Sequence, residues 1–406
     1  MSVSWGQDRP QLVCSLREGE EVTGCVVIDS LVGGRACGGL RMVPRIDEAK
    51  MRRLAGNMTL KYGFLGMPRG GAKAAVRGDP EAPEPERLQI LADFGRAIAP
   101  LLRQRVLSVG ADTGTDPVGI RHMLESVGVS ARGRWSESVP AGYYPALTVL
   151  TGIKRAALHL GLNPKGRSAA VQGWGKVGSA LGSLLDQSGI RVVAISTSRG
   201  AIYDDQGLEV SELLKLGREH GSRVVDAYPG AQRIERDSLL GLKVDILCPC
   251  AISDTVRADN AATIQARMIV SGANNAVTPE ADRLLFERGV LCLPDFVTNC
   301  GVILGSAMEV AGIATHRVAS FIEQRVGAGM AYLLEEAEQK GVPVREVAVR
   351  YAQSRFERMC QEAEQVTPLT RLIAFAVALN RRGLLPNPVV AAASLPYFKR
   401  MVTPDW

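Results

Sequence analysis

Residues 167–178 have the sequence RSAAVQGWGKVG, in which a short apolar stretch runs into a glycine-rich turn. A helical pattern follows over 179–187, and a second apolar stretch occupies 191–196. The order strand, turn, helix, strand is the context in which a GxGxxG sequence indicates a dinucleotide-binding βαβ unit. The alternative is a glycine-rich turn in an unrelated α/β domain.

Each residue of the motif has an expected part in holding a dinucleotide. Gly173 and Gly175 let the backbone turn tightly and approach a pyrophosphate, which sits at the positive N-terminus of the helix that Lys176 and Val177 begin. Gly178 lets the helix pack closely on the strand. We therefore expect these five residues to bind NAD or NADP.

The rest of the chain predicts a two-domain α/β protein. Short apolar stretches at 244–248, 268–270 and 291–293 alternate with helical patterns such as 278–288, which favours a Rossmann-type, doubly wound parallel sheet. We place this dinucleotide-binding domain at 145–325. Residues 1–144 form a second α/β domain, onto which the helical tail 326–406 packs.

The composition excludes several other classes of protein. With 46% hydrophobic and 22% charged residues in 406, the chain can bury two cores, and no apolar run is long enough to cross a membrane. The N-terminus reaches charge and proline within ten residues, so we expect no secretion signal and a cytoplasmic protein. The net charge of +6 comes from interspersed basic residues, which argues against nucleic-acid binding. Eight cysteines without a CxxC pair predict reduced thiols and no metal site.

Lysine is scarce in this chain, which draws attention to two positions. Of the 48 basic residues only ten are lysines, although a lysine, unlike an arginine, can lose its proton. Lys61 lies in NMTLKY and Lys73 in PRGGAKAAV, both apolar or small-residue settings; the second stretch is not a phosphate-binding P-loop, because alanine stands where that motif has its lysine. Burial and a second ammonium nearby would lower the pKa of Lys73 and make it a base. The alternative for each lysine is an ordinary surface ammonium.

Two further polar stretches allow two interpretations each. Asp112, in VGADTGTD, is either a turn-former or a catalytic carboxylate. Thr197, Ser198 and Arg199 follow the second strand of the βαβ unit, where a carboxylate would favour NAD. Hydroxyl groups and an arginine can instead accommodate the 2′-phosphate of NADP, unless Arg199 merely begins a turn.

Seven blocks, in order along the chain, resemble the glutamate, leucine, phenylalanine and valine dehydrogenase superfamily. They are GGLR at 38–41, MTLK at 58–61, GGAK at 70–73, DTGT at 112–115, the GxGxxG motif, GANN with TPEAD at 272–282, and PDFVTN at 294–299. The resemblance implies reversible, NAD(P)-dependent oxidative deamination of an L-amino acid to a 2-oxo acid and ammonia. It also implies that the first domain binds the amino acid and forms a homo-oligomer.

The resemblance assigns roles to residues on both the substrate and the cofactor side. Lys61 corresponds to the lysine that binds the α-carboxylate, Lys73 and Asp112 to the catalytic pair, and Asn299 to an asparagine that helps hold the substrate. Gly39 is also expected to bind the substrate. Neutral Lys73 would activate water and Asp112 would shuttle protons, while hydride crosses the cleft between the domains. Cys250, Ala251 and Asn274 fall on the cofactor side.

The chain also departs from the family pattern. Glutamate-specific members carry a lysine where this chain has Cys37, and a second substrate carboxylate without that cation would be costly to desolvate. Ser306 falls where glutamate dehydrogenases place a side-chain pocket serine. We expect an apolar or aromatic substrate rather than glutamate. Pro145 and Thr148 replace a threonine and a glycine near the nicotinamide.

Two rival functions remain compatible with the sequence. One is a catalytically inactive dinucleotide-binding protein that acts as a sensor or partner-binding module. The other is an NAD(P)-dependent enzyme of a different reaction type on the same scaffold. Retention of Lys61, Lys73, Asp112 and Asn299 together speaks against inactivity, because a decayed site has no need of two buried lysines.

Overall fold

The computed structural model describes residues 10–131, 139–140, 142–363, 375, 379 and 387–402. The chain divides into two compact units, described separately below. Unit 1 comprises Met1–Trp135 and Tyr351–Val390, and unit 2 comprises Ser136–Arg350 and Ala391–Trp406. The sequence placed these boundaries at 144/145 and 325/326. Residues 1–9, on which the prediction of no secretion signal depends, and much of the predicted tail between 364 and 386 lie outside the described residues.

Unit 1 is built on a five-stranded sheet of order β1-β2-β4-β3-β5. Strands β3, β4 and β5 are parallel, whereas β1 and β2 are antiparallel to their neighbours. Its elements are β1 (Leu12–Glu18), β2 (Glu21–Ile28), β3 (Ala36–Val43), α1 (Glu48–Leu65), β4 (Gly70–Arg77), α2 (Glu84–Ala97), α3 (Ala99–Arg103), β5 (Leu107–Ala111) and α4 (Pro117–Ser126).

Alternation along the strands gives this sheet two buried faces. Leu40, Ala74 and Val76 point into a core with α2 and α4, while Val27 and Ala75 pack with α1 on the opposite face. Odd-numbered positions of β3 and β4 therefore lie on the α1 side, because successive side chains of a strand point to opposite faces. This side carries Lys73, whose strand neighbour is Val27.

Unit 2 contains a seven-stranded sheet of order β12-β11-β10-β6-β7-β8-β9, parallel except for β8 and β9. Its strands are β6 (Ser168–Gln172), β7 (Arg191–Thr197), β8 (Gly200–Tyr203), β9 (Gln232–Ile234), β10 (Ile246–Pro249), β11 (Met268–Val270) and β12 (Leu291–Leu293). The predicted Rossmann-type alternation is confirmed. The short antiparallel edge strands β8 and β9 were not predicted.

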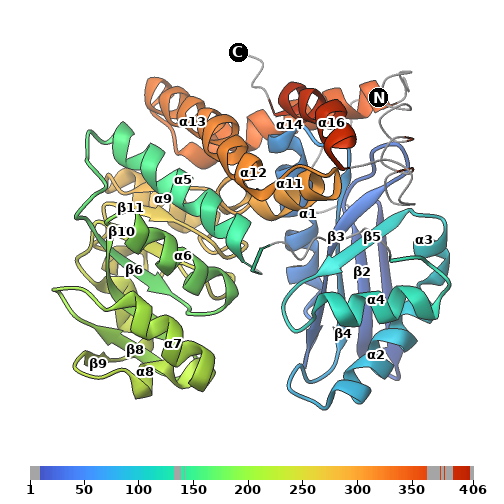
Figure 1. Cartoon of the computed structure of the whole chain (residues 1–406), viewed down its shortest axis with the longest axis horizontal. Helices are drawn as coiled ribbons and strands as arrows, with labels where there is room; N and C mark the ends of the chain where they lie inside the picture. The colour runs from blue at the N-terminus through green and yellow to red at the C-terminus, as the bar shows by residue number, and fades with distance from the viewer. Residues whose placement is uncertain are drawn as a thin grey trace. The chain divides into compact units, whose positions relative to one another are not determined.

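Helices cover both faces of the unit 2 sheet (Figure 1). α5 and α6 pack on one face, and η2, η3 and α9 on the other. They are α5 (Tyr143–His159), α6 (Lys176–Gln187), α7 (Val210–His220), η1 (Gly221–Arg223), α8 (Val224–Ala227), η2 (Arg236–Gly241), η3 (Ala261–Thr263), α9 (Pro279–Glu287) and α10 (Asp295–Thr298).

The described part of the last third of the chain is helical. It contains α11 (Gly301–Val310), α12 (Thr315–Phe321), the π-helical turn η4 (Ile322–Val326), α13 (Gly327–Lys340), α14 (Val344–Ala363) and α16 (Asn387–Met401). α14 begins in unit 2 and continues into unit 1, where Phe356 and Met359 pack against Val32. Within the described ranges, no helix combines the length and the apolar character needed to cross a bilayer.

Candidate active site

A buried ion pair joins two strands of unit 1 that are not neighbours in the sheet. Lys73 on β4 contacts the Oδ2 atom of Asp112, which directly follows β5, and β3 runs between these two strands. Arg41 of β3 places its Nε 3.4 Å from the same oxygen. Only 4% of the Lys73 side chain and 14% of the Asp112 side chain are exposed, so both charges are largely removed from water.

Gly39 makes this contact possible. It lies on β3 between the register pairs Cys37↔Gly71 and Leu40↔Ala74, so the same offset places it beside Lys73. A Cβ added to Gly39 would lie 2.6 Å from Oδ2 of Asp112, closer than any side chain tolerates. The Asp112 side chain therefore occupies the space that a side chain at position 39 would fill, and there it meets the Lys73 ammonium.

The environment of Asp112 keeps it ionised. Burial alone would raise its pKa, but the charges of Lys73 and Arg41, the hydrogen bond from Lys73 and a 2.7 Å hydrogen bond from the Thr113 N–H together lower it below the usual 3.8. The stability that this carboxylate contributes is accordingly present above pH 3.8 and is lost as the pH falls through the lowered value.

The loop that carries Asp112 is tied to the end of β3. Thr115 donates to the Leu40 carbonyl at 2.8 Å and accepts from the Asp112 N–H at 2.9 Å. Gly114 has φ +75°, and a Cβ there would lie 2.1 Å from the Met42 carbonyl oxygen. The loop needs glycine at this position both for its conformation and for its close approach to β3.

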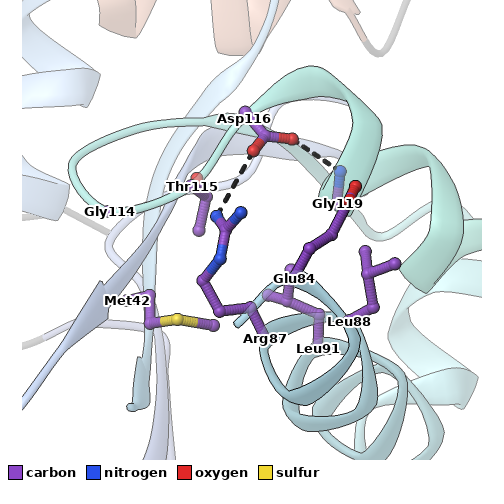
Figure 2. Close-up of a pocket in the computed structure, with 9 residues that line it drawn as sticks. All are labelled: Met42, Glu84, Arg87, Leu88, Leu91, Gly114, Thr115, Asp116 and Gly119. Atoms are coloured by element: carbon purple, nitrogen blue, oxygen red, sulfur yellow. Dashed lines mark hydrogen bonds and ion pairs between the residues drawn. The ribbon is translucent and has the colours of Figure 1, made fainter. Parts of the chain in front are cut away.

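Asp116 closes the same loop onto α2 and α4 (Figure 2). Its carboxylate accepts from the Gly119 N–H at 2.8 Å, capping α4, and lies 3.5 Å from the Arg87 guanidinium of α2. The cavity that these residues line has a volume of about 10 Å³, space for about one water molecule. We therefore assign this hollow a structural role in supporting the loop rather than a ligand.

Lys61 is the second buried lysine of unit 1, with 3% of its surface exposed. It lies on α1, which is anchored to β4 two residues earlier: Thr59 and Ser30 share a 2.7 Å hydrogen bond, and Ser30 accepts from the Gly71 N–H at 2.9 Å. A Cβ on Gly71 would lie 2.3 Å from the Thr59 nitrogen, so helix and strand meet with no side chain between them.

Cys37 occupies the same face of β3 as Gly39, and its thiol interacts with Tyr62 of α1. Burial raises the pKa of Tyr62 well above its usual value, and the charge and the hydrogen bond of Cys37 raise it further. Tyr62 itself is 3% exposed. The position where the family resemblance predicts a cation in glutamate-specific members is thus occupied by a thiol against a phenol.

In unit 2 the glycine motif has the geometry that the sequence predicted. Gly173 adopts φ +97°, and a Cβ on Gly178 would lie 1.8 Å from the Gly173 carbonyl oxygen. Gly175, the residue before α6, has no atom within 4 Å of an added Cβ, so its surface is open to a ligand. Lys176 and Val177 form the first turn of α6, whose N–H groups face this opening.

Neighbouring strand ends complete the edge of the sheet at this motif. The N–H groups of Gly173 and Trp174 donate to the Ser196 carbonyl at 3.1 and 2.9 Å. The Cys250 N–H donates to the Gln172 carbonyl at 2.7 Å, and a Cβ on Gly173 would lie 2.6 Å from that of Ala251. Cys250 and Ala251 therefore lie beside the motif, at the point where the strand order reverses.

Two arginines meet at the end of β7. Thr197 donates to the Ser222 carbonyl at 2.7 Å and accepts from the Arg199 N–H at 3.1 Å, while Ser198 is exposed. The Arg199 guanidinium lies 3.9 Å from Asp226, and Arg233 of β9 lies 2.8 Å from the same carboxylate. Sequence reasoning missed Arg233, because only the pairing of β9 with β8 brings it here.

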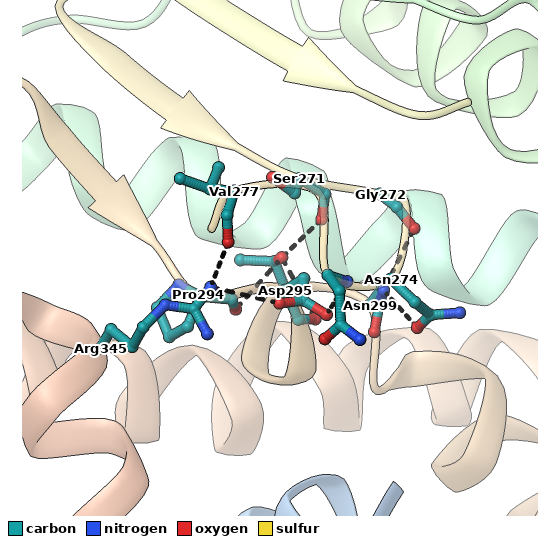
Figure 3. Close-up of polar contacts among 10 residues, drawn as sticks. Ser271, Gly272, Asn274, Val277, Pro294, Asp295, Asn299 and Arg345 are labelled. Carbon is teal, nitrogen blue, oxygen red and sulfur yellow. Dashed lines mark hydrogen bonds and ion pairs between the residues drawn. The ribbon is translucent and has the colours of Figure 1, made fainter. Parts of the chain in front are cut away.

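Asn299 and Asn274 form the polar centre of a second group in unit 2 (Figure 3). The Asn299 amide nitrogen donates to the Gly272 carbonyl at 3.2 Å and to the side-chain oxygen of Asn274 at 3.1 Å. The Oδ1 atom of Asn299 is buried without a hydrogen-bond partner. It is an acceptor available to a bound molecule.

Asp295 and Arg345 hold this group in place (Figure 3). Asp295, 1% exposed, accepts from the Asn275 N–H at 2.8 Å and lies 3.5 Å from Arg345, which donates to the Val277 carbonyl at 3.2 Å. Asn275 has φ +51°, so the loop needs such fixing. Neither Asp295 nor Arg345 was singled out from the sequence.

The residues that depart from the family pattern also have defined places. Thr148 of α5 accepts from the Gly301 N–H at 3.1 Å, joining α5 to α11. A Cβ on Gly301 would lie 2.1 Å from that hydroxyl. Pro145 lies buried in the first turn of α5, and Ser306 lies partly exposed on α11.

The predicted site residues thus form separate groups within each unit. Unit 1 brings Gly39, Lys73 and Asp112 into contact, and Arg41, which the sequence analysis missed, joins them. Arg41 lies two residues after Gly39 and therefore on the same face of the strand, a spacing that could have identified it. Unit 2 gathers the cofactor residues along one sheet edge. In the described part of the chain, no three acidic, cysteine or histidine side chains cluster as metal ligands would.

Comparison with known proteins identifies relatives of both units. The family model described as Glutamate/Leucine/Phenylalanine/Valine dehydrogenase matches residues 144–364, and the dimerisation-domain model of Glu/Leu/Phe/Val dehydrogenases matches residues 12–128. A glutamate dehydrogenase of Thermotoga maritima is 35% identical over 307 residues, which cover 71% of this chain and 72% of that protein. An NADP(+)-dependent glutamate dehydrogenase of Pyrobaculum calidifontis is 34% identical over 287 residues, 67% of this chain and 68% of the relative.

Solved structures give the same result. The hetero-hexameric glutamate dehydrogenase of Thermus thermophilus, in its Leu-bound form, aligns with a TM-score of 0.77 and 26% identity over 89% of this chain and 92% of that one. The L-tryptophan dehydrogenase of Nostoc punctiforme aligns with a TM-score of 0.59 and 25% identity over 86% of this chain and 95% of that one.

The space at Gly39 can be tested without an activity assay. We predict that Gly39→Ala raises the pKa of the Asp112 carboxyl towards its usual value of about 3.9, because the added methyl group displaces the carboxylate from Lys73. Carbon-13 NMR titration of labelled aspartate side chains measures this. Gly110→Ala is the matched control, since Gly110 pairs with Gly39 but an added Cβ meets nothing within 4 Å. An Asp112 pKa equal to that of the parent in Gly39→Ala would contradict the argument.

Proposed function

The chain belongs to the glutamate/leucine/phenylalanine/valine dehydrogenase family, oxidoreductases that act on the amino group of amino acids with NAD or NADP, and we propose that its substrate is an apolar or aromatic L-amino acid. The reaction is reversible: the amino acid, water and NAD(P)⁺ give the 2-oxo acid, ammonium and NAD(P)H, with release of a proton. The observation that carries the proposed chemistry is the contact of Lys73 with Asp112 beside Gly39. The observation that carries the proposed substrate class is Cys37 against Tyr62.

The groups of unit 1 account for the proton transfers. Lys61, a buried cation, binds the α-carboxylate, and Asp112 takes a proton from the substrate ammonium or returns it. Lys73 removes a proton from the water that attacks the 2-imino acid, and it must first pass its own proton on. The adjacent Asp112 carboxylate accepts that proton within the ion pair. Asp112 must release it to solvent before it can take a proton from the substrate ammonium, so the two residues act in sequence as one proton-transfer unit.

The residues of unit 2 would hold the cofactor, and the side-chain amide of Asn299 would contact the bound molecules. Bound NAD or NADP would supply the acceptor for the hydride on the α-carbon of the amino acid. The first turn of α6 and the open surface at Gly175 suit the pyrophosphate, with Gly173, Val177, Cys250 and Ala251 around it. The unpaired Oδ1 of Asn299, positioned by Asn274, accepts a hydrogen bond from the bound molecules.

Three finer proposals complete this function. Cys37 against Tyr62 favours an uncharged substrate side chain, with Ser306 as a polar contact on α11. Arg199 and Arg233, which share Asp226, favour NADP over NAD. Residues 12–128 match a dimerisation domain, which supports a homo-oligomer.

Replacement of Lys73 by alanine tests the mechanism. We expect turnover to fall by about 10²- to 10⁴-fold, the range of general acid–base catalysis, while NAD(P) binding is retained. Absorbance of the reduced cofactor measures turnover, and a fluorescence titration measures cofactor binding. The exposed surface lysine variant Lys215→Ala serves as the control. If Lys73→Ala turned over like the parent protein, the proposed role of Lys73 would be wrong.

A panel of the twenty L-amino acids with both cofactors tests substrate class. We expect apolar or aromatic amino acids to be oxidised with kcat/KM at least about tenfold above that of glutamate, because no cation faces its second carboxylate at Cys37. Cys37→Lys should raise kcat/KM for glutamate by about 10- to 100-fold, the value of one charge-assisted hydrogen bond. Cys37→Ser, which adds no charge, is the control. Strong activity of the parent with glutamate alone would refute this assignment.

The cofactor preference depends on the arginines at the end of β7. We predict that Arg199→Ala raises KM for NADP by about tenfold and leaves KM for NAD unchanged, since only NADP carries the 2′-phosphate. Arg236→Ala, another exposed arginine of unit 2, is the matched control. Equal effects on both cofactors, or none, would argue against a phosphate contact.

A further inference from the structure

A second pocket lies in unit 2, and none of the residues assigned above to the substrate or the cofactor lines it. Its volume is about 280 Å³. The walls come from the C-terminal end of α5, from α9 and β12, and from the end of α13 with the turn into α14. Apolar side chains form most of the lining, among them Phe286, Val290, Leu334 and Val342.

Asp282 is the exception in this lining. Only 3% of its surface is exposed. No group in the described ranges donates a hydrogen bond to its carboxyl or forms an ion pair with it. The neighbouring buried carboxylate Asp295, by contrast, has both a backbone N–H and Arg345 as partners. A carboxylate removed from water without a donor is unfavourable, so this group lacks a partner that a ligand could supply.

The charges around Asp282 compensate its own charge only in part. Its pKa is raised from 3.8 to about 6: burial is the largest cause, Arg345 and Arg283 oppose it, and Glu346 and Asp295 add to it. Above that pH the pocket therefore holds an ionised carboxylate. The charged or titratable groups on the packed elements are His159 on α5, Arg283 on α9, Asp295 on α10, Glu338 on α13, and Arg345 and Glu346 on α14.

None of the cations among these groups is placed to neutralise Asp282 directly. Arg345 is engaged by Asp295 and by the Val277 carbonyl. His159 lies 3.8 Å from Glu338 on the pocket wall. The lining contains two carboxyl groups, of Asp282 and Glu338, and one imidazole, of His159. The pocket therefore favours a positively charged occupant.

We propose that this pocket binds a small organic cation with an apolar body, a primary alkylammonium or arylalkylammonium ion, whose N–H groups donate to Asp282. The apolar walls remove the hydrocarbon part from water, and the ammonium supplies both the counter-charge and the hydrogen bonds that the carboxyl lacks. A water molecule takes about 30 Å³ of liquid, so the volume accommodates a ligand the size of hexylammonium.

The probe is hexylammonium chloride, titrated calorimetrically into the full-length protein at pH 7.5. We expect a Kd of about 1 mM, ordinary for a ligand of this size. Asp282→Asn should weaken binding at least about tenfold. Glu280→Gln, which removes an exposed carboxylate from the same helix, should leave the Kd unchanged. Absence of binding to the parent, or equal Kd values for the parent and Asp282→Asn, would overturn the proposal.

Two further measurements keep the result independent of the folding of one variant. Affinity for hexylammonium should fall about tenfold from pH 7.5 to pH 5, because Asp282 becomes protonated while an alkylammonium, like lysine, stays charged. Ala337→Leu fills the pocket without touching the carboxyl and should also weaken binding. Hexanoate that binds more tightly than hexylammonium at pH 7.5, or an affinity that does not change with pH, would count against a cation site.

Discussion

Two opposite charges meet across a β-strand in unit 1, and they can do so only because the strand has no side chain at that point. Lys73 and Asp112 belong to β4 and to the end of β5, and Gly39 of β3 leaves the space between them. Either charge alone would be strongly unfavourable in such a buried place, and truncation of one partner leaves the other uncompensated. The ion pair, the glycine and the loop ties at Thr115 and Gly114 therefore depend on one another.

Much of the fold follows from local sequence signals, whereas the long-range partners do not. The strand–GxGxxG–helix order predicted β6, α6 and β7, because each glycine answers a local steric need. β8 and β9 escaped notice because strands of three or four residues at an edge have little periodicity. Lys73 and Asp112 were identified from the sequence, but Arg41, Tyr62 and Arg233 were not, since register and packing between distant segments decide where their side chains lie.

Three buried carboxylates show how differently one chain treats the same chemical group. Asp112 faces an ammonium and a guanidinium, and Asp295 accepts from a backbone N–H beside Arg345. The arrangement at Asp112 favours the ionised form, because donors and positive charge replace the water that burial removes. Asp282 has neither, and its raised pKa follows from that difference. The three carboxylates therefore differ in their partners rather than in their depth of burial: Asp112 and Asp295 are paired within the protein, and Asp282 is the one for which we propose a ligand.

The position of Cys37 in the sheet links it to the charge of the substrate side chain. Cys37 and Gly39 share one face of β3, so a residue at 37 lies two positions from the space in which the Asp112 side chain lies. A lysine there would add a third cation to a face that already holds Lys73 and Arg41, and only an acidic substrate would offset it. The Cys37 thiol instead forms a hydrogen bond with the buried Tyr62, so position 37 adds no cation to this face. An uncharged substrate side chain then leaves no buried charge unpaired.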